Sequence, residues 1–165
     1  MLRRVVEAAL QAPVEPVIAV LGANAAAIQP CLEGLPVHVI VNPDWSEGMG
    51  SSIRAGIKEL LAIAPGARGA VVALADQPGF SPAHVAQLIE AQARSLRSIV
   101  ASLCNGELMP PAFFGPEHFA ALLALRGDRG ARSLFQAHPG EVESVDARDL
   151  QDLDTKSDYD EFLKR

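Results

Sequence analysis

The strongest constraint on the fold is an alternation between short apolar runs and longer stretches with helical periodicity. The apolar runs show no regular alternation with polar residues, which predicts strands buried on both faces. Such strands, separated by helices, are typical of a mostly parallel sheet with helices on both faces. The predicted strands are Val17–Leu21, Val37–Val41, Val71–Ala75, Ile99–Leu103, Ala112–Phe114 and Val142–Val145. The sequence therefore predicts an α/β fold.

Amphipathic helices are predicted between these strands. Ser81 stands directly before one of them and is expected to cap its amino terminus. The predicted helices are the opening segment MLRRVVEAALQAP, Ala25–Leu32, Ser51–Ile63, Pro82–Ser95, Glu117–Leu125, Ala131–Ala137 and a closing helix from Ser157.

Composition narrows the class of protein. The chain has 165 residues, of which 49% are hydrophobic, and this suits one globular domain. A formal net charge of −6 argues against nucleic acid as the main partner. No segment is long and apolar enough to cross a bilayer, so no membrane association and a cytoplasmic location are expected. Cys31 and Cys104 are interpreted as small residues of a reduced protein.

The histidines carry no recognisable pattern. None of the four pairs with another at a spacing typical of metal ligands, so each is interpreted as an ordinary surface or core residue. They are His38, His84, His118 and His138.

Residues that follow the strands are the best candidates for a ligand site, because ligands bind parallel sheets at the carboxyl ends of the strands. Gly48 and Gly50 permit close backbone approach, and Ser51 and Ser52 are expected where helix amides lack partners. This turn can cradle a nucleotide. The alternative is an ordinary glycine turn with a serine cap.

Asp76 follows the predicted strand Val71–Ala75, in the phrase LADQPG. A carboxylate at that position points into the ligand crevice, and one carboxylate with substrate phosphates is a usual way to hold Mg²⁺. The alternative is a turn-capping aspartate, with Pro78 stiffening the turn.

An acidic cluster lies near the end of the chain. Thr155 and Asp158 have the spacing of a capping box, which explains those two residues structurally. Asp152 and Asp154 are left without such an explanation, and Asp154 is a candidate second metal carboxylate.

Five phrases occur in order along the chain: VLGANA, IVNPDWSEGMGSSIRAGI, LADQPG, GDRGAR and DLDTKSDYDEF. In this order they resemble the MobA-like nucleotidyltransferases, most closely the molybdenum cofactor cytidylyltransferases, over nearly the whole chain. The resemblance implies a Rossmann-like nucleotidyltransferase fold. It also implies Mg²⁺-dependent transfer of CMP from CTP to the phosphate of a molybdopterin cofactor, with release of pyrophosphate.

The resemblance also implies roles for individual residues. Asp76 and Asp154 match the family's catalytic and metal-binding carboxylates, and a molybdoenzyme is an expected transient partner. The residues implied in nucleotide binding are Gly48, Met49, Gly50, Ser51, Ser52, Gln77 and Pro78. Those implied in acceptor binding are Pro111, Asp128 and Arg132.

The chain departs from the family pattern at its start. Family members begin with a strand and a glycine-rich loop, LAAGxSxRMGxxK, whereas Met1-Leu2-Arg3-Arg4 resembles the helix that follows that loop. We therefore expect residues 1–165 to form a single, N-terminally shortened domain whose sheet lacks a central strand. A shortened form of a longer protein is preferred to a natural short form that has lost catalysis. Activity of this chain alone is in question on either explanation.

Several functions remain open at this point. Met109-Pro110 stand where the family more often has Gly and then Asn or His, and this leaves the acceptor's identity open. GTP in place of CTP, or another phosphate acceptor such as methylerythritol phosphate, are alternatives within the enzyme class. A non-catalytic protein that binds and delivers the molybdenum cofactor is the alternative from another class.

Overall fold

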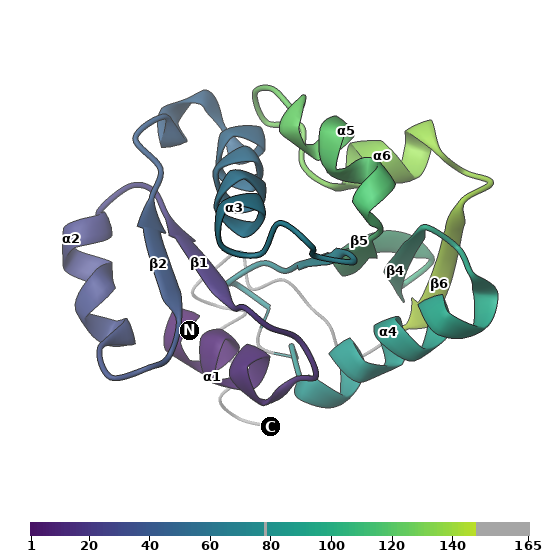
Figure 1. The fold of residues 1–165 in the computed structure, drawn as a ribbon, viewed down its shortest axis with the longest axis horizontal. Helices are drawn as coiled ribbons and strands as arrows, with labels where there is room; N and C mark the ends of the chain where they lie inside the picture. The colour runs from purple at the N-terminus through teal and green to yellow at the C-terminus, as the bar shows by residue number, and fades with distance from the viewer. Residues whose placement is uncertain (78, 148–165) are drawn as a thin grey trace.

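The strands form two separate sheets in the computed structural model, which describes residues 1–77 and 79–147 (Figure 1). The smaller sheet pairs β1 with β2 in parallel, and the larger has the strand order β3-β5-β4-β6. The strands are β1 (Ile18–Leu21), β2 (His38–Val41), β3 (Ala70–Val72), β4 (Ile99–Cys104), β5 (Glu107–Phe114) and β6 (Val142–Asp146).

The helices predicted within the described residues are present. Ser81 caps α4 as expected, because its side-chain oxygen accepts a hydrogen bond of 3.2 Å from the amide of His84. The α-helices are α1 (Leu2–Gln11), α2 (Ala25–Ile28), α3 (Met49–Ile63), α4 (Pro82–Ser95), α5 (Phe119–Leu123) and α6 (Arg132–Ala137). The 3₁₀ segments are η1 (Gln29–Leu32), η2 (Trp45–Glu47) and η3 (Pro116–His118). The closing helix expected from Ser157 lies outside the described residues.

Helices cover both faces of the larger sheet, which confirms that part of the prediction (Figure 1). On one face, α3, α5 and α6 bury the main core around Phe114, whose ring stacks on that of Phe135 with centroids 5.9 Å apart. On the other face, Leu88 of α4 packs against Val100 of β4. None of the helices in the described part of the chain is both long and apolar enough to span a membrane.

The expected single, mostly parallel sheet needs correction. Strands β3, β4 and β6 share one direction, but β5 runs opposite and pairs antiparallel with both β3 and β4. The cause is a hairpin between β4 and β5, in which Asn105 and Gly106 form the turn with φ of 52° and 85°. Positive φ at both positions defines the turn that best matches strand twist.

The pairing of strands is also interrupted between β1 and β3. Among the described residues, β1 pairs only with β2, and β3 pairs only with β5. From the sequence, we expect a sheet that lacks a central strand. That expectation stays a prediction.

Candidate functional site

Asp76 lies in a turn four residues beyond the end of β3, and its side chain is exposed. The predicted strand Val71–Ala75 was too long, because β3 ends at Val72. Val72 pairs with Ala112, and the next residues of β5 are Pro111 and Pro110. Prolines have no backbone N–H to donate, so the ladder stops there and the chain is released into the turn that carries Asp76.

Two buried side chains donate hydrogen bonds to the backbone carbonyls of these prolines. Gln77 donates from Nε2 to the carbonyl of Pro110 at 2.8 Å, and Ser102 donates from Oγ to the carbonyl of Pro111 at 2.6 Å. Both side chains are fully buried. Gln77 therefore anchors the turn bearing Asp76 to β5. Its predicted contact with a nucleotide stays a prediction.

His84 supports the same network from α4. The single hydroxyl hydrogen of Ser102 goes to Pro111, so the 2.8 Å contact between His84 Nε2 and Ser102 Oγ requires the proton on Nε2. Burial holds the pKa of His84 below its ordinary value. A neutral His84 therefore orients the Ser102 hydroxyl toward the carbonyl of Pro111.

Gly48 joins η2 to α3 in a conformation that suits glycine, with φ of 112°. A Cβ at this position would lie 2.5 Å from Oδ1 of Asp128 and 2.6 Å from the carbonyl carbon of Gly127. Position 48 therefore requires a glycine, because it packs closely against the loop of residues 126–130, which lies between α5 and α6. Met49 follows as the first residue of α3 and is exposed.

The hydroxyls of Ser51 and Ser52 are held by Asn42, which follows β2. Asn42 donates from Nδ2 to Ser51 Oγ at 2.7 Å and to Ser52 Oγ at 3.1 Å. Ser51 is buried and donates in turn to the carbonyl of Gly48. Ser52 is half-buried, and no hydrogen bond donated by its hydroxyl joins it to another described residue.

The expectation of an unpartnered amide is wrong for Ser51, and the neighbouring amide of Gly50 also has a partner. The amide of Gly50 donates to the carbonyl of Gly127 at 2.9 Å, and the amide of Ser51 donates to Gly48 at 3.1 Å. The 126–130 loop covers this helix end, so its carbonyl occupies a place where an anion could have bound.

The same contact brings together two predicted segments that lie far apart in the sequence. The Gly48–Ser52 segment, predicted to bind nucleotide, touches the 126–130 loop, which carries the predicted acceptor residue Asp128. Arg132 lies just beyond at the start of α6, with a nitrogen 3.8 Å from a carboxylate oxygen of Glu107. Pro111, the third predicted acceptor residue, is buried inside β5.

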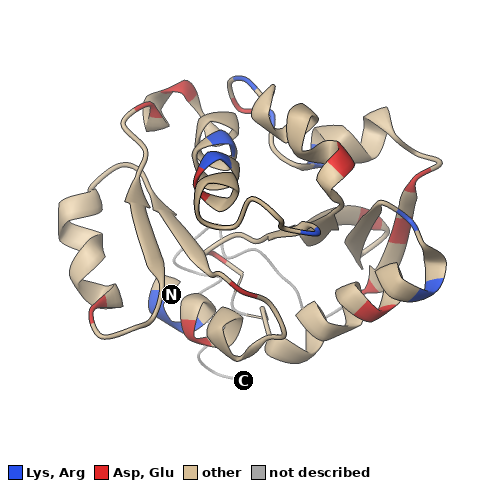
Figure 2. Cartoon of the chain, in the orientation of Figure 1, with Lys and Arg blue, Asp and Glu red and all other residues tan. Residues whose placement is uncertain are grey.

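A further contact, which the sequence did not predict, joins α3 to the chain just before the 126–130 loop. Arg54 of α3 forms an ion pair with Glu47 and also donates to the carbonyl of Leu125 at 2.6 Å. The hydrogen bond between the Arg54 guanidinium and the Glu47 carboxylate lowers the pKa of Glu47 and raises the pKa of Arg54 from their ordinary values. Figure 2 shows basic residues on α3 and on the loop between α5 and α6. No local pattern in the sequence marks this long-range pair.

The one tryptophan of the chain stands beside this site. Trp45 in η2 is 48% exposed, and a Cβ at Gly22, after β1, would lie 2.8 Å from its own Cβ. The turns that follow β1 and β2 are therefore in contact. Pro78 and Asp154, two further predicted site residues, lie outside the described residues.

Comparison with known proteins places these features in a family. The family model described as a MobA-like NTP transferase domain matches residues 1–142. Purine catabolism protein PucB of Bacillus subtilis (strain 168) is 36% identical over 121 residues, covering 71% of this chain and 57% of PucB. The chain thus spans little more than half the length of that relative. Nicotine blue oxidoreductase of Paenarthrobacter nicotinovorans is 34% identical over 148 residues, covering 84% of this chain and 71% of that protein.

A solved structure agrees with this assignment. Rv0371c from Mycobacterium tuberculosis H37Rv matches with a TM-score of 0.83 at 28% identity, covering 99% of this chain and 83% of Rv0371c. The complex of Rv0371c with manganese matches with a TM-score of 0.81 at 26% identity, covering 99% of this chain and 85% of that one. The chain has the α/β nucleotidyltransferase fold and belongs to the family of MobA-like NTP transferase domains.

Proposed function

We propose that this protein transfers CMP from CTP to the terminal phosphate of a molybdopterin cofactor. An oxygen of the acceptor phosphate forms a bond to the α-phosphorus of CTP, and the bond from that phosphorus to the bridging oxygen of the β-phosphate breaks. Pyrophosphate leaves with the bonding electrons. The family membership supports nucleotidyl transfer, and the motif resemblance supports the choice of CTP and molybdopterin.

One observation carries this proposal furthest. The Gly48–Ser52 segment and the 126–130 loop are joined by the hydrogen bond from the amide of Gly50 to the carbonyl of Gly127. A transferase must hold its two substrates side by side in a reactive orientation. If each segment binds the substrate that its motif implies, their contact sets the nucleotide next to the acceptor.

The carboxylate oxygens of Asp76 are of the kind that binds Mg²⁺. Its carboxylate is exposed on a turn that Gln77 ties to the sheet, and Mg²⁺ is often held by one or two carboxylates together with substrate phosphates. We propose Asp76 as a ligand, with Asp154 as the second. When bound, the ion would neutralise charge on the phosphates of the nucleotide.

The remaining groups would position substrates. Asn42 orients the Ser52 hydroxyl, which can donate a hydrogen bond to the nucleotide. The clamp formed by Glu47, Arg54 and the Leu125 carbonyl keeps the 126–130 loop against α3. These roles need no covalent step on the protein, because phosphoryl chemistry depends mainly on positioning and charge neutralisation.

The choice of nucleotide can be tested through the fluorescence of Trp45, which is exposed beside the proposed site. In Mg²⁺, CTP should change this fluorescence at a concentration about 5- to 150-fold lower than GTP, since a base-specific hydrogen bond is typically worth about 1–3 kcal/mol. Addition of EDTA should weaken the CTP response. Equal responses to the two nucleotides would remove the cytidylyl assignment.

The alternatives predict different outcomes. A GTP-dependent enzyme reverses the order of the two nucleotides. A cytidylyltransferase with another acceptor, such as methylerythritol phosphate, keeps the preference for CTP but releases no pyrophosphate with molybdopterin. A non-catalytic delivery protein binds molybdopterin, releases no pyrophosphate, and is indifferent to replacement of Asp76.

A further inference from the structure

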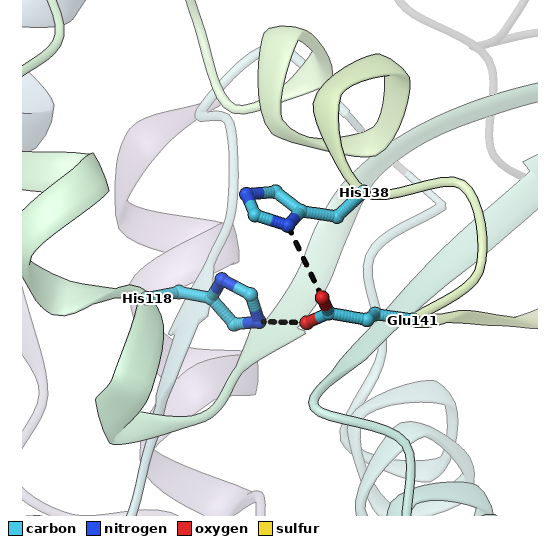
Figure 3. Close-up of side chains that lie close together, drawn as sticks. All are labelled: His118, His138 and Glu141. Carbon is cyan, nitrogen blue, oxygen red and sulfur yellow. Dashed lines mark hydrogen bonds and ion pairs between the residues drawn. The ribbon is translucent and has the colours of Figure 1, made fainter.

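Two histidines and one glutamate that the proposed function does not use converge on one point. His118 ends η3, His138 follows the last residue of α6, and Glu141 directly precedes β6 (Figure 3). Nε2 of His118 lies 3.4 Å from Oε2 of Glu141, and Nδ1 of His138 lies 3.3 Å from Oε1. One potential ligand atom from each of the three residues lies within 4.8 Å of the other two. Within residues 1–77 and 79–147, this is the one such group of three.

The two nitrogen-to-oxygen distances resemble those between ligands of one metal ion. A charge-assisted hydrogen bond is usually about 2.7–2.9 Å long, which is shorter than either contact. Ligands about 2.0–2.1 Å from a tetrahedral Zn²⁺ lie about 3.3 Å from one another. The contacts of 3.3 and 3.4 Å have this length, and they reach the two different oxygens of the Glu141 carboxylate. His118 is 3% exposed and held in place, whereas Glu141 is exposed and can adjust.

Ser98 supports the group from the residue before β4. Its hydroxyl donates to Oε2 of Glu141 at 2.9 Å, and its oxygen lies 2.8 Å from Nε2 of His118. Hydrogen bonds from Ser98 and then His138 hold the pKa of Glu141 below its ordinary value, so the carboxylate is ionised at neutral pH. A hydroxyl that orients a ligating carboxylate is a common outer partner of metal sites.

We propose that His118, His138 and Glu141 form a binding site for a divalent transition metal of the zinc class. Imidazole and carboxylate together suit Zn²⁺, Co²⁺ or Ni²⁺, whereas Mg²⁺ and Ca²⁺ prefer oxygen ligands alone. Three protein ligands leave one position of a tetrahedral ion for water.

This site is separate from the one built around Asp76. Ser98 and Glu141 lie where β4 and β6 begin, while Asp76 lies beyond the end of β3. Because β3, β4 and β6 run in one direction, the two sites lie at opposite ends of these strands. An ion here would join η3, α6 and β6 and stabilise the fold, since a ligand that binds only the native state raises its stability.

Titration of the full chain with Co²⁺ tests the proposal, because tetrahedral Co²⁺ has a distinctive visible absorption. A Cys31→Ser background removes the exposed thiol, which could bind metal on its own. We expect one Co²⁺ per chain, displaced by Zn²⁺, and a higher midpoint of thermal unfolding with Zn²⁺. His138→Ala and Glu141→Gln should each lower the affinity at least about 10-fold, since even outer partners of metal ligands are worth that much.

His38→Ala is the matched control, because His38 is an exposed histidine on β2 in the other sheet. It should leave the cobalt spectrum and the affinity unchanged. Circular dichroism of each variant without metal establishes that it is folded. An affinity that changes less than twofold in both His138→Ala and Glu141→Gln would overturn the proposal, as would an equal loss in His38→Ala. Neither result bears on Mg²⁺ or CTP binding at Asp76.

Discussion

Replacing Asp76 by asparagine should largely abolish the effect of Mg²⁺ on CTP binding and should lower the rate of CMP transfer at least about 100-fold. A metal that neutralises phosphate charge is worth several kcal/mol in the transition state, and each 1.36 kcal/mol corresponds to about a tenfold change in rate. Asparagine keeps the size of the side chain but loses the negative charge that attracts the cation. Trp45 fluorescence and a pyrophosphate assay measure the two effects.

The stability of this variant separates a metal role from a structural one. Asp76 is exposed, so loss of the contact that it makes should change the free energy of unfolding by no more than about 1 kcal/mol. Glu90→Gln, at an exposed carboxylate on α4, is the control and should leave the Mg²⁺ response intact. A variant at Asp76 that transfers CMP at the normal rate would show that this carboxylate is only part of a turn.

Replacing Gly48 by alanine should lower the free energy of unfolding by at least about 2 kcal/mol. A side chain at a φ of 112° is strained, at a cost of about 1–3 kcal/mol. The new Cβ would also lie 2.5 Å from Oδ1 of Asp128 and 2.7 Å from the carbonyl oxygen of Gly127, so the backbone of the 126–130 loop must move. Urea unfolding followed by circular dichroism measures the change.

Gly66→Ala is the matched control for this prediction. No atom lies within 4 Å of a Cβ at Gly66, and its φ lies outside the region that disfavours side chains. Alanine there should leave stability unchanged or raise it slightly, by restricting the unfolded chain. If Gly48→Ala proved as harmless as Gly66→Ala, the close packing of the 126–130 loop on α3 would be contradicted.

Features set by neighbouring residues could be predicted from the sequence. Helix α4 has the predicted bounds, Pro82–Ser95, because Ser81 supplies the cap and proline suits the first turn. The amphipathic start of the chain forms α1 and buries Val5 and Val6. In both cases, the information lies within a few residues of the element.

The hairpin of β4 and β5 shows a local signal that was missed. Asn105-Gly106 between two apolar runs is a strong indicator of a tight turn, and it reverses the direction of β5. The pair Pro110-Pro111 then accounts for the early end of β3 and for the shift in register opposite Ser102. Weighting these dipeptides would have predicted the mixed sheet.

The contacts that build the two sites could not be predicted from local patterns. The hydrogen bond between Gly50 and Gly127 joins segments far apart in the sequence. The group formed by His118, His138 and Glu141 likewise depends on how η3, α6 and β6 pack. Sequence spacing gave no sign that His118 and His138 lie close together, with ring centroids 5.0 Å apart.

Transfer of a labelled α-phosphate tests the central claim most directly. The chain, alone and with the family's strand and glycine-rich loop LAAGxSxRMGxxK added before Met1, is mixed with Mg²⁺, molybdopterin and CTP that carries a radioactive α-phosphorus, and the label in the pterin product is measured together with pyrophosphate. We predict that label enters the pterin in equal amounts with pyrophosphate, and that GTP labelled in the same way is a poor donor. Molybdopterin that binds the protein but gains no label from CTP would contradict this account.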